Sequence, residues 1–100
     1  MTEITTAEQF KKEVTDAVGL VMVDFWAPWC GPCKIVDQVL PLLVDAKIVK
    51  VNVDEAPELS DVFMVRSIPT TMFFKAGKNV RQFVGAQTRI TYQDTIDEFK

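Results

Sequence analysis

An apolar run leads directly into the only two cysteines of this chain, in a stretch that spans Leu20–Lys34 and reads LVMVDFWAPWCGPCK. Its first part, Leu20–Trp26, is almost continuously apolar, the pattern of a strand that is covered on both faces of its sheet. Cys30 and Cys33 follow, and the second helix is predicted to open there. At this spacing the two sulfurs can close a small disulfide ring if Cys33 lies in the first turn of that helix. The pair would then be a two-electron switch.

Two other uses of the cysteine pair are weighed against redox chemistry. As a structural staple, a loop of about four residues contributes roughly 2 kcal/mol, against about 4.7 kcal/mol for a loop of about a hundred residues. As a zinc site, two thiolates supply half of a tetrahedral shell, and the chain has no histidine to complete it. A CxxC pair near a strand-to-helix turn, with no other cysteine, favours a redox pair.

The size and composition of the chain limit its function classes. One hundred residues, of which 48% are hydrophobic and 25% charged, predict one soluble globular domain over residues 1–100. The net charge of −3 offers no basic patch for nucleic acid. The N-terminus lacks the pattern of a signal peptide, and no apolar run is long enough to cross a membrane. If this is the full translated product, these features predict a reducing cytosol.

The apolar segments predict five strands. Their expected ranges are Glu3–Ile4, Leu20–Trp26, Ile48–Val53, Thr70–Lys75 and Asn79–Val84. The last two flank Ala-Gly-Lys and read as a β-hairpin. With helices between the others, this order predicts an α/β fold with a mixed sheet and helices on both sides.

Four helices are predicted between and after these strands. The first begins with a capping box of Thr6 and Gln9, carries apolar residues at helical spacing and ends at Gly19. The third begins near Pro57, which is acceptable in a first turn. The apolar positions expected on the first, second and last helices are Phe10, Val14 and Val18; Val36, Val39, Leu40 and Leu43; and Tyr92, Ile96 and Phe99.

Several ordered motifs resemble the thioredoxin family over nearly the whole chain. Trp26–Lys34 is similar to the family's active-site signature, and Gly-Pro between the cysteines is its typical dipeptide. Ile68–Thr70 resembles the loop that carries a cis-proline, and Phe73–Gly77 resembles the family's hairpin. Val84–Ala86 matches a segment of the substrate groove. The resemblance implies the thioredoxin fold, with a mixed five-stranded central sheet flanked by four helices.

The chain departs from the family pattern at a few positions. Many members have a kinking proline where this chain has Gln38, and here Pro41 lies three residues later. Any kink of the second helix is therefore predicted to move by nearly one turn. Met64 and Ser67 stand where glycine is common in the family.

The resemblance implies a role for each residue of the cysteine motif. Cys30 is expected to attack a partner's disulfide, because the N-terminus of a helix favours a thiolate. Cys33, one turn further and more shielded, is expected to resolve the mixed disulfide. Gly31 and Pro32 are expected to tune the redox balance, since Pro32 limits the freedom of the turn.

Asp24 and Lys50 fall where the family keeps a buried acid and its lysine neighbour. In the functional interpretation, Asp24 lies behind Cys33, has a pKa raised by burial and exchanges the thiol's proton. Lys50 would moderate that burial. The alternatives are a solvent-facing carboxylate at a strand end and an ordinary surface lysine.

An apolar rim is expected around Cys30. Pro69 is the candidate cis-proline, whose loop would pair with an extended substrate segment; a trans turn proline is the alternative. Trp29 is expected to be exposed, whereas Trp26 is expected in the core. The full set of expected substrate-binding residues is Pro28, Trp29, Ile68, Pro69, Val84, Gly85 and Ala86.

The leading hypothesis is a cytoplasmic, monomeric protein disulfide reductase that maintains cell redox homeostasis and carries electrons. The resemblance implies recharging by thioredoxin reductase, through which NADPH and FAD act, with no cofactor or metal bound to this chain. It suggests ribonucleotide reductase, peroxiredoxin and methionine sulfoxide reductase as clients. Neither nucleic acid nor a membrane is expected as a partner.

Three alternatives remain. An oxidase or isomerase would use the same fold, but such relatives usually carry a histidine between the cysteines. A binding module would use the apolar rim with incidental redox chemistry. Glutaredoxin-like chemistry usually has Pro-Tyr between the cysteines, and a glutathione pocket is not evident.

Overall fold

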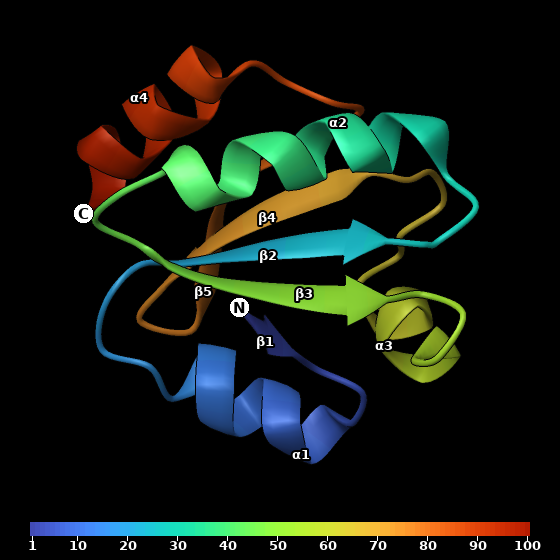
Figure 1. The fold of residues 1–100 in the computed structure, drawn as a ribbon. Helices are drawn as coiled ribbons and strands as arrows, with labels where there is room; N and C mark the ends of the chain where they lie inside the picture. Colours follow the sequence, from blue (N-terminus) through green and yellow to red (C-terminus); the bar gives the residue numbers. More distant parts are fainter.

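The central sheet has five strands in the spatial order β1-β3-β2-β4-β5. The computed structural model describes Met1–Lys100 (Figure 1). The strands β1, β2 and β3 are parallel, and β4 is antiparallel to both β2 and β5. The bounds are β1 (Thr2–Glu3), β2 (Val21–Trp26), β3 (Lys47–Asn52), β4 (Thr70–Lys75) and β5 (Lys78–Val84). The predicted mixed sheet is confirmed, with β1, β3 and β5 each beginning one residue earlier than expected and β2 one residue later.

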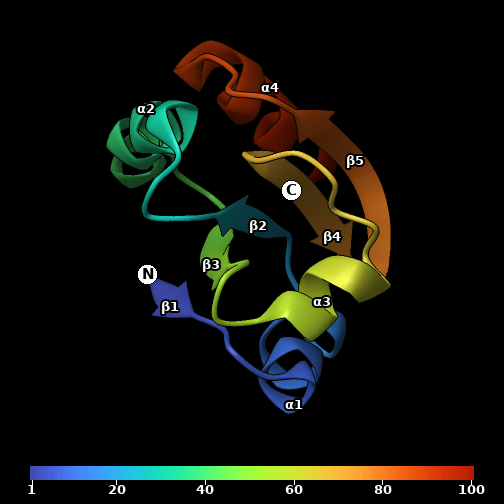
Figure 2. The ribbon, with the colours of Figure 1, turned by 90° about the vertical axis from the view of Figure 1, so that its right-hand side faces the viewer.

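Helices cover both faces of this sheet, as predicted (Figure 2). One face is covered by α2 (Gly31–Val39) and α4 (Arg89–Phe99), and the other by α1 (Ala7–Phe10) and α3 (Pro57–Val62). A π-helical segment, Lys11–Thr15, continues α1, and a 3-10 turn, Leu40–Leu42, continues α2. None of the helices has the length and apolar character needed to cross a lipid bilayer.

Two apolar clusters fill the space between the sheet and the helices. Because side chains alternate along a strand, β2 contributes to both clusters. Val21, Val23 and Phe25 belong to the cluster under α1 and α3, and Met22 belongs to the cluster under α2 and α4. The alternation therefore directs Asp24 to the face that α2 and α4 cover.

The first helix starts as predicted but ends earlier. The capping box of Thr6 and Gln9 is present, with the Gln9 N–H donating to the Thr6 hydroxyl at 3.1 Å. The predicted end at Gly19 is wrong, because the chain leaves the helix after Thr15 in a widened turn. Val18 continues the apolar spacing, yet its side chain is 92% exposed, since no neighbouring element covers it. The apolar spacing in the sequence therefore extends beyond the residues that pack into the core.

The second helix ends where the sequence predicts a shifted kink. The α-helical part stops at Val39, and Pro41 lies within the 3-10 turn. Proline lacks the N–H that a further α-helical turn requires, and its ring collides with the carbonyl four residues earlier. Leu43 was expected on this helix, and it is buried, but its backbone is extended. The α-helix therefore ends before Pro41 and does not continue beyond a kink.

The predicted short helix and hairpin are both present. The end of α3 places Met64 at φ +54°, where its N–H donates to the Asp61 carbonyl and the next N–H donates to Ser60. This is the hydrogen-bond pattern of a helix stop that usually uses glycine. The hairpin turns through Ala76 and Gly77, both at positive φ.

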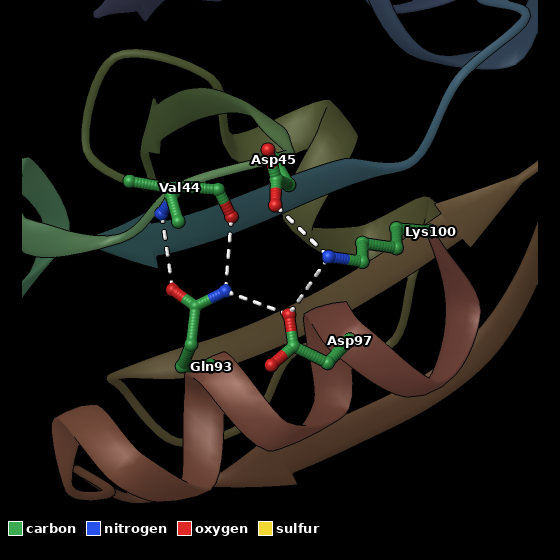
Figure 3. A network of polar contacts seen from close by, with 5 residues as sticks. All are labelled: Val44, Asp45, Gln93, Asp97 and Lys100. Atoms are coloured by element: carbon green, nitrogen blue, oxygen red, sulfur yellow. Dashed lines mark hydrogen bonds and ion pairs between the residues drawn. The ribbon is translucent and has the colours of Figure 1, made fainter.

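A polar network ties α4 to the loop between α2 and β3 (Figure 3). The Gln93 side chain donates to the Val44 carbonyl and accepts from the Val44 N–H, both at 3.0 Å. Lys100 pairs with Asp45 at 3.0 Å and with Asp97 at 3.5 Å. These contacts hold the C-terminal helix against the chain beyond α2.

Candidate active site

Cys30 and Cys33 form a disulfide at the start of α2, with their Cα atoms 5.3 Å apart. Cys30 is the N-cap residue of the helix, and its Sγ accepts the Cys33 N–H at 3.2 Å. Pro32 stands at the start of the helix, where its missing N–H leaves no hydrogen bond unmade. Cys30 is 4% exposed and Cys33 is 2% exposed, so the expected difference in shielding is small in the disulfide form.

Three loops lie at the end of the sheet where the central strand β2 finishes. The register pairs Phe25 with Thr70 on β4, and Thr70 with Val84 on β5. The loop after β2, the loop before β4 and the segment after β5 therefore lie at one end of the sheet (Figure 1). This topology places the segments that contain the predicted rim residues at the same end of the sheet as the disulfide.

The peptide bond between Ile68 and Pro69 is cis, as the family resemblance implies. The Pro69 carbonyl accepts the Gly85 N–H at 2.8 Å, which joins two of the predicted rim segments. Ile68 packs, partly buried, against the cluster that contains both cysteines. Val84 is 61% exposed, whereas Pro69 itself is buried.

Trp29 lies beside Cys30 with 69% of its surface exposed, in agreement with the predicted rim. Its indole N–H donates to the Asp54 carboxylate at 2.9 Å, which fixes the ring over the loop after β3. Pro28 next to it is also exposed, whereas Gly85 and Ala86 are half-buried. The predicted rim is thus a mixture of exposed apolar side chains and partly covered backbone.

Asp24 is fully buried, as predicted, and neither of its carboxyl oxygens has a hydrogen-bond partner. Burial raises the pKa of this carboxyl from 3.8 to about 7, against the opposing charge of Lys50. The side chain points to the face of the sheet that α2 covers. The site therefore holds a carboxyl that changes charge near neutral pH.

Lys50 is the strand neighbour of Asp24, but its ammonium is paired elsewhere. The two residues are in register on β2 and β3, and the Lys50 ammonium forms a salt bridge with Asp37 of α2. The same ammonium lies 4.4 Å from the centre of the Trp26 ring. Trp26, expected in the core, is half-buried and forms the surface on which the lysine rests.

Two further hydroxyl groups lie on the same face as Asp24. Thr71 is its register partner on β4, and the Thr71 hydroxyl is buried without a partner. The Tyr92 hydroxyl accepts the Gln87 N–H at 3.1 Å. Burial raises the pKa of Tyr92, and the nearby charge of Asp24 contributes in the same direction. The buried carboxyl therefore shares its face of the sheet with two buried hydroxyl-bearing side chains.

The sequence interpretation missed Asp37, Asp54, Thr71 and Tyr92 as parts of this site. Asp37 carried one usable signal, since it lies four residues after Cys33 and so on the same side of the helix. The other three reach the site through contacts between distant segments, which spacing along the chain does not reveal.

The geometry suits thiol–disulfide exchange more than any other chemistry. A disulfide closes at a helix N-terminus next to the exposed Trp29, and a buried carboxyl lies on the face of the sheet that the same helix covers. The chain presents no group of three potential metal-ligating side chains.

Comparisons with known proteins agree with this geometry. The sequence profile of the family described as Thioredoxin matches residues 1–98. Thioredoxin 1 of Nostoc sp. is 44% identical over 98 residues, covering 93% of this chain and 92% of the relative. The M-type chloroplastic thioredoxin of Chlamydomonas reinhardtii is 39% identical, covering 92% of this chain and 69% of the relative. The solved structure of a mutant thioredoxin from Halobacterium salinarum superposes with a TM-score of 0.91 at 31% identity, over 98% of this chain and 88% of that one.

Proposed function

Because the chain belongs to the thioredoxin family and is a protein disulfide oxidoreductase, we propose that residues 1–100 act as one domain in which Cys30 is the nucleophile and Cys33 the resolving thiol. The observation that carries this assignment is the disulfide at the N-terminus of α2, beside an exposed apolar rim. The redox-active group is this pair of sulfurs, so no bound cofactor is required.

The reductive half-reaction is a pair of sulfur displacements. The Cys30 thiolate attacks one sulfur of a client disulfide, forms a mixed disulfide and expels the other client sulfur as a thiolate. Cys33 then loses its proton and attacks the Cys30 sulfur, which releases the second client thiol and closes the Cys30–Cys33 bond. Two electrons leave this chain and reduce one client disulfide. The helix N-terminus and the Cys33 N–H favour the thiolate at Cys30.

Asp24 is proposed to accept the Cys33 proton during the second displacement. Its burial and its pKa of about 7 support this role, because such a group exchanges protons with a thiol near neutral pH. Asp24→Asn is expected to slow resolution of the mixed disulfide. A resolution rate that stays equal to that of the original chain from pH 6 to 9 would remove Asp24 from the mechanism.

Client segments are proposed to bind in an extended form across the rim. Trp29 and Val84 offer exposed apolar contacts, while the backbone of Ile68, which forms no backbone hydrogen bond within the chain, offers pairing groups. Such a surface accepts many sequences, since a deep pocket with fixed polar groups is what gives small-molecule specificity. Pro28, Ile68 and Ala86 complete this surface, and Gly31 and Pro32 set the redox balance of the turn.

Members of this family exchange electrons with thioredoxin reductase and with client proteins that contain disulfides. For this chain we propose recharging by an NADPH-dependent flavoprotein reductase, which makes the chain a carrier in electron transport. We also propose that the chain is a monomer and acts in the cytoplasm. Ribonucleotide reductase, peroxiredoxin and methionine sulfoxide reductase are the proposed clients. The relatives include a chloroplastic protein, so the compartment is a specific point to test.

The first experiment measures the reduction potential of the Cys30–Cys33 couple by equilibration with glutathione couples of known ratio. A potential well below the glutathione poise is expected for a reductase. A potential well above it would indicate an oxidase or isomerase and would overturn the proposed direction of electron flow.

A trapping experiment tests the two cysteine roles. With disulfide-bonded insulin as the client, Cys33→Ser should accumulate a covalent mixed disulfide, and Cys30→Ser should form none. Accumulation in Cys30→Ser and not in Cys33→Ser would reverse the assignment of nucleophile and resolving thiol.

A further inference from the structure

The salt bridge between Lys50 and Asp37 changes the surroundings of the buried carboxyl. The ammonium of Lys50 binds the Asp37 carboxylate and rests on the Trp26 ring, while both oxygens of Asp24 lack a partner. The Lys50 side chain is 12% exposed and the Asp37 side chain is 45% exposed, so water reaches this pair mainly from the side of Asp37. A nearby cation that could pair with Asp24 is therefore engaged by another acid.

The backbone places two carboxyl groups, those of Asp24 and Asp37, as alternative partners for the Lys50 ammonium. Asp24 and Lys50 are in register on adjacent parallel strands, and alternation directs both side chains toward α2. Asp37 approaches from α2, about one helical turn after Cys33. The same flexible lysine stem thus has two carboxyl groups to choose between, one in the sheet and one on the helix.

We propose that Asp37 is a positioning residue, which holds the Lys50 ammonium against Trp26 and away from Asp24 and so sets the charge state of the buried carboxyl. The inference rests on the proposed role of Asp24 in exchanging the Cys33 proton. Without Asp37, the ammonium would turn to the carboxylate of Asp24 and favour its ionised form. The carboxyl would then be a weaker base for the thiol.

Other groups facing Asp24 act in known directions. Glu3 on β1 is a second carboxylate whose charge raises the pKa of Asp24, as does the charge of Asp37, and Lys50 on β3 lowers it. Thr71 on β4 and Tyr92 on α4 are neutral hydroxyl groups. Asp37 differs from Glu3 in one respect, because only Asp37 binds the lysine.

The test is a titration of the Asp24 carboxyl by carbon NMR in the oxidised protein, in which neither cysteine titrates. Asp37→Ala is expected to lower the midpoint by about one pH unit. Glu3→Ala is the matched control, since it removes a facing carboxylate without freeing Lys50, and it should lower the midpoint by clearly less. In a Lys50→Met background, the effect of Asp37→Ala should shrink to that of Glu3→Ala.

Two outcomes would overturn the inference. One is a shift in Asp37→Ala no larger than in Glu3→Ala, and the other is a shift that persists in full in the Lys50→Met background. The pH profile of mixed-disulfide resolution separates this inference from the role of Asp24. If the NMR midpoint moves and the kinetic midpoint does not, Asp37 controls the carboxyl as proposed, and Asp24 is not the base.

Discussion

The face of the sheet under α1 and α3 buries the larger apolar cluster and no ionisable side chain, whereas the face under α2 and α4 buries the carboxyl of Asp24 and the hydroxyl groups of Thr71 and Tyr92 among its residues. On the first face, Phe10, Phe63 and Phe74 pack as a triangle of rings with centroids 4.6 to 5.8 Å apart. On the second face, Asp24 and Thr71 are buried without partners. The comparison indicates that apolar packing on one face offsets the cost of burying polar groups without partners on the other face.

The largest expected effect comes from a substitution in the core of the face under α1 and α3. Phe10→Ala removes a buried ring from the aromatic triangle and should lower the free energy of unfolding by about 3 to 5 kcal/mol in urea titrations. Phe99→Ala, in the half-buried end of α4, serves as the control and should cost clearly less. Disulfide exchange by the folded fraction should stay unchanged, since Phe10 lies on the face away from Asp24. Equal losses in the two variants would contradict the assigned division of packing.

The second effect removes the buried carboxyl from the face under α2 and α4. The folded protein binds a proton at Asp24 up to about pH 7, whereas the unfolded chain releases it near pH 4. The stability contributed by the neutral carboxyl is therefore complete below pH 4 and is lost as the pH rises toward and through 7. Asp24→Asn should leave stability nearly unchanged at pH 4 and raise it by up to about 4 kcal/mol at pH 8.

Urea unfolding at a series of pH values measures this difference. Asp54→Asn is a suitable control, because Asp54 is exposed and its carboxylate accepts a hydrogen bond only from the Trp29 indole. A gain in Asp24→Asn that is the same at pH 4 and pH 8 would show that ionisation is not its cause.

A smaller effect concerns the polar tether of α4. Gln93→Ala removes both hydrogen bonds to Val44 (Figure 3) and should cost about 1 to 2 kcal/mol, because the two bonds are partly exposed. Gln93→Ala should also increase the rate of hydrogen exchange in α4 more than it increases the rate in α1. Lys100→Ala is the comparison, since its ion pairs are exposed and should contribute less than about 1 kcal/mol. A reversed order of these two losses would contradict the tether.

The smallest expected effect is a gain in stability at the end of α3, on the face that α1 and α3 cover. Met64→Gly relieves a left-handed backbone conformation at an exposed side chain and should raise stability by about 1 kcal/mol. Thermal unfolding measures the gain, with Val62→Gly, at the last residue of α3, as the control that should lose stability. A loss in Met64→Gly would mean that its side chain contributes packing that exceeds the conformational cost.

Local signals predicted much of the fold. The capping box at Thr6, the hairpin at Ala76–Gly77 and the apolar strand around Asp24 each follow from short-range chemistry, and the structure confirms them. The cis peptide at Pro69 followed only from the family resemblance. The early end of the first helix was missed, because the spacing of Val18 cannot tell whether another element will cover it.

The chemistry of the site was less accessible to prediction. The sequence marks Asp24 as an acid within an apolar strand, and burial then explains its raised pKa. The partner of Lys50 was beyond prediction, since two carboxyl groups compete for it and only the packing of α2 on the sheet decides between them. Contacts between segments far apart in sequence depend on the assembled layers and not on local pattern.

The two edges of the sheet bear on self-association. The edge strand β1 has only two residues, and the opposite edge strand β5 carries charged residues, with Arg81 engaged by Glu98. Short or charged edges give another chain little backbone to pair with, which disfavours growth of the sheet into aggregates. The sheet therefore offers a second copy of this chain little to pair with at either of its edges.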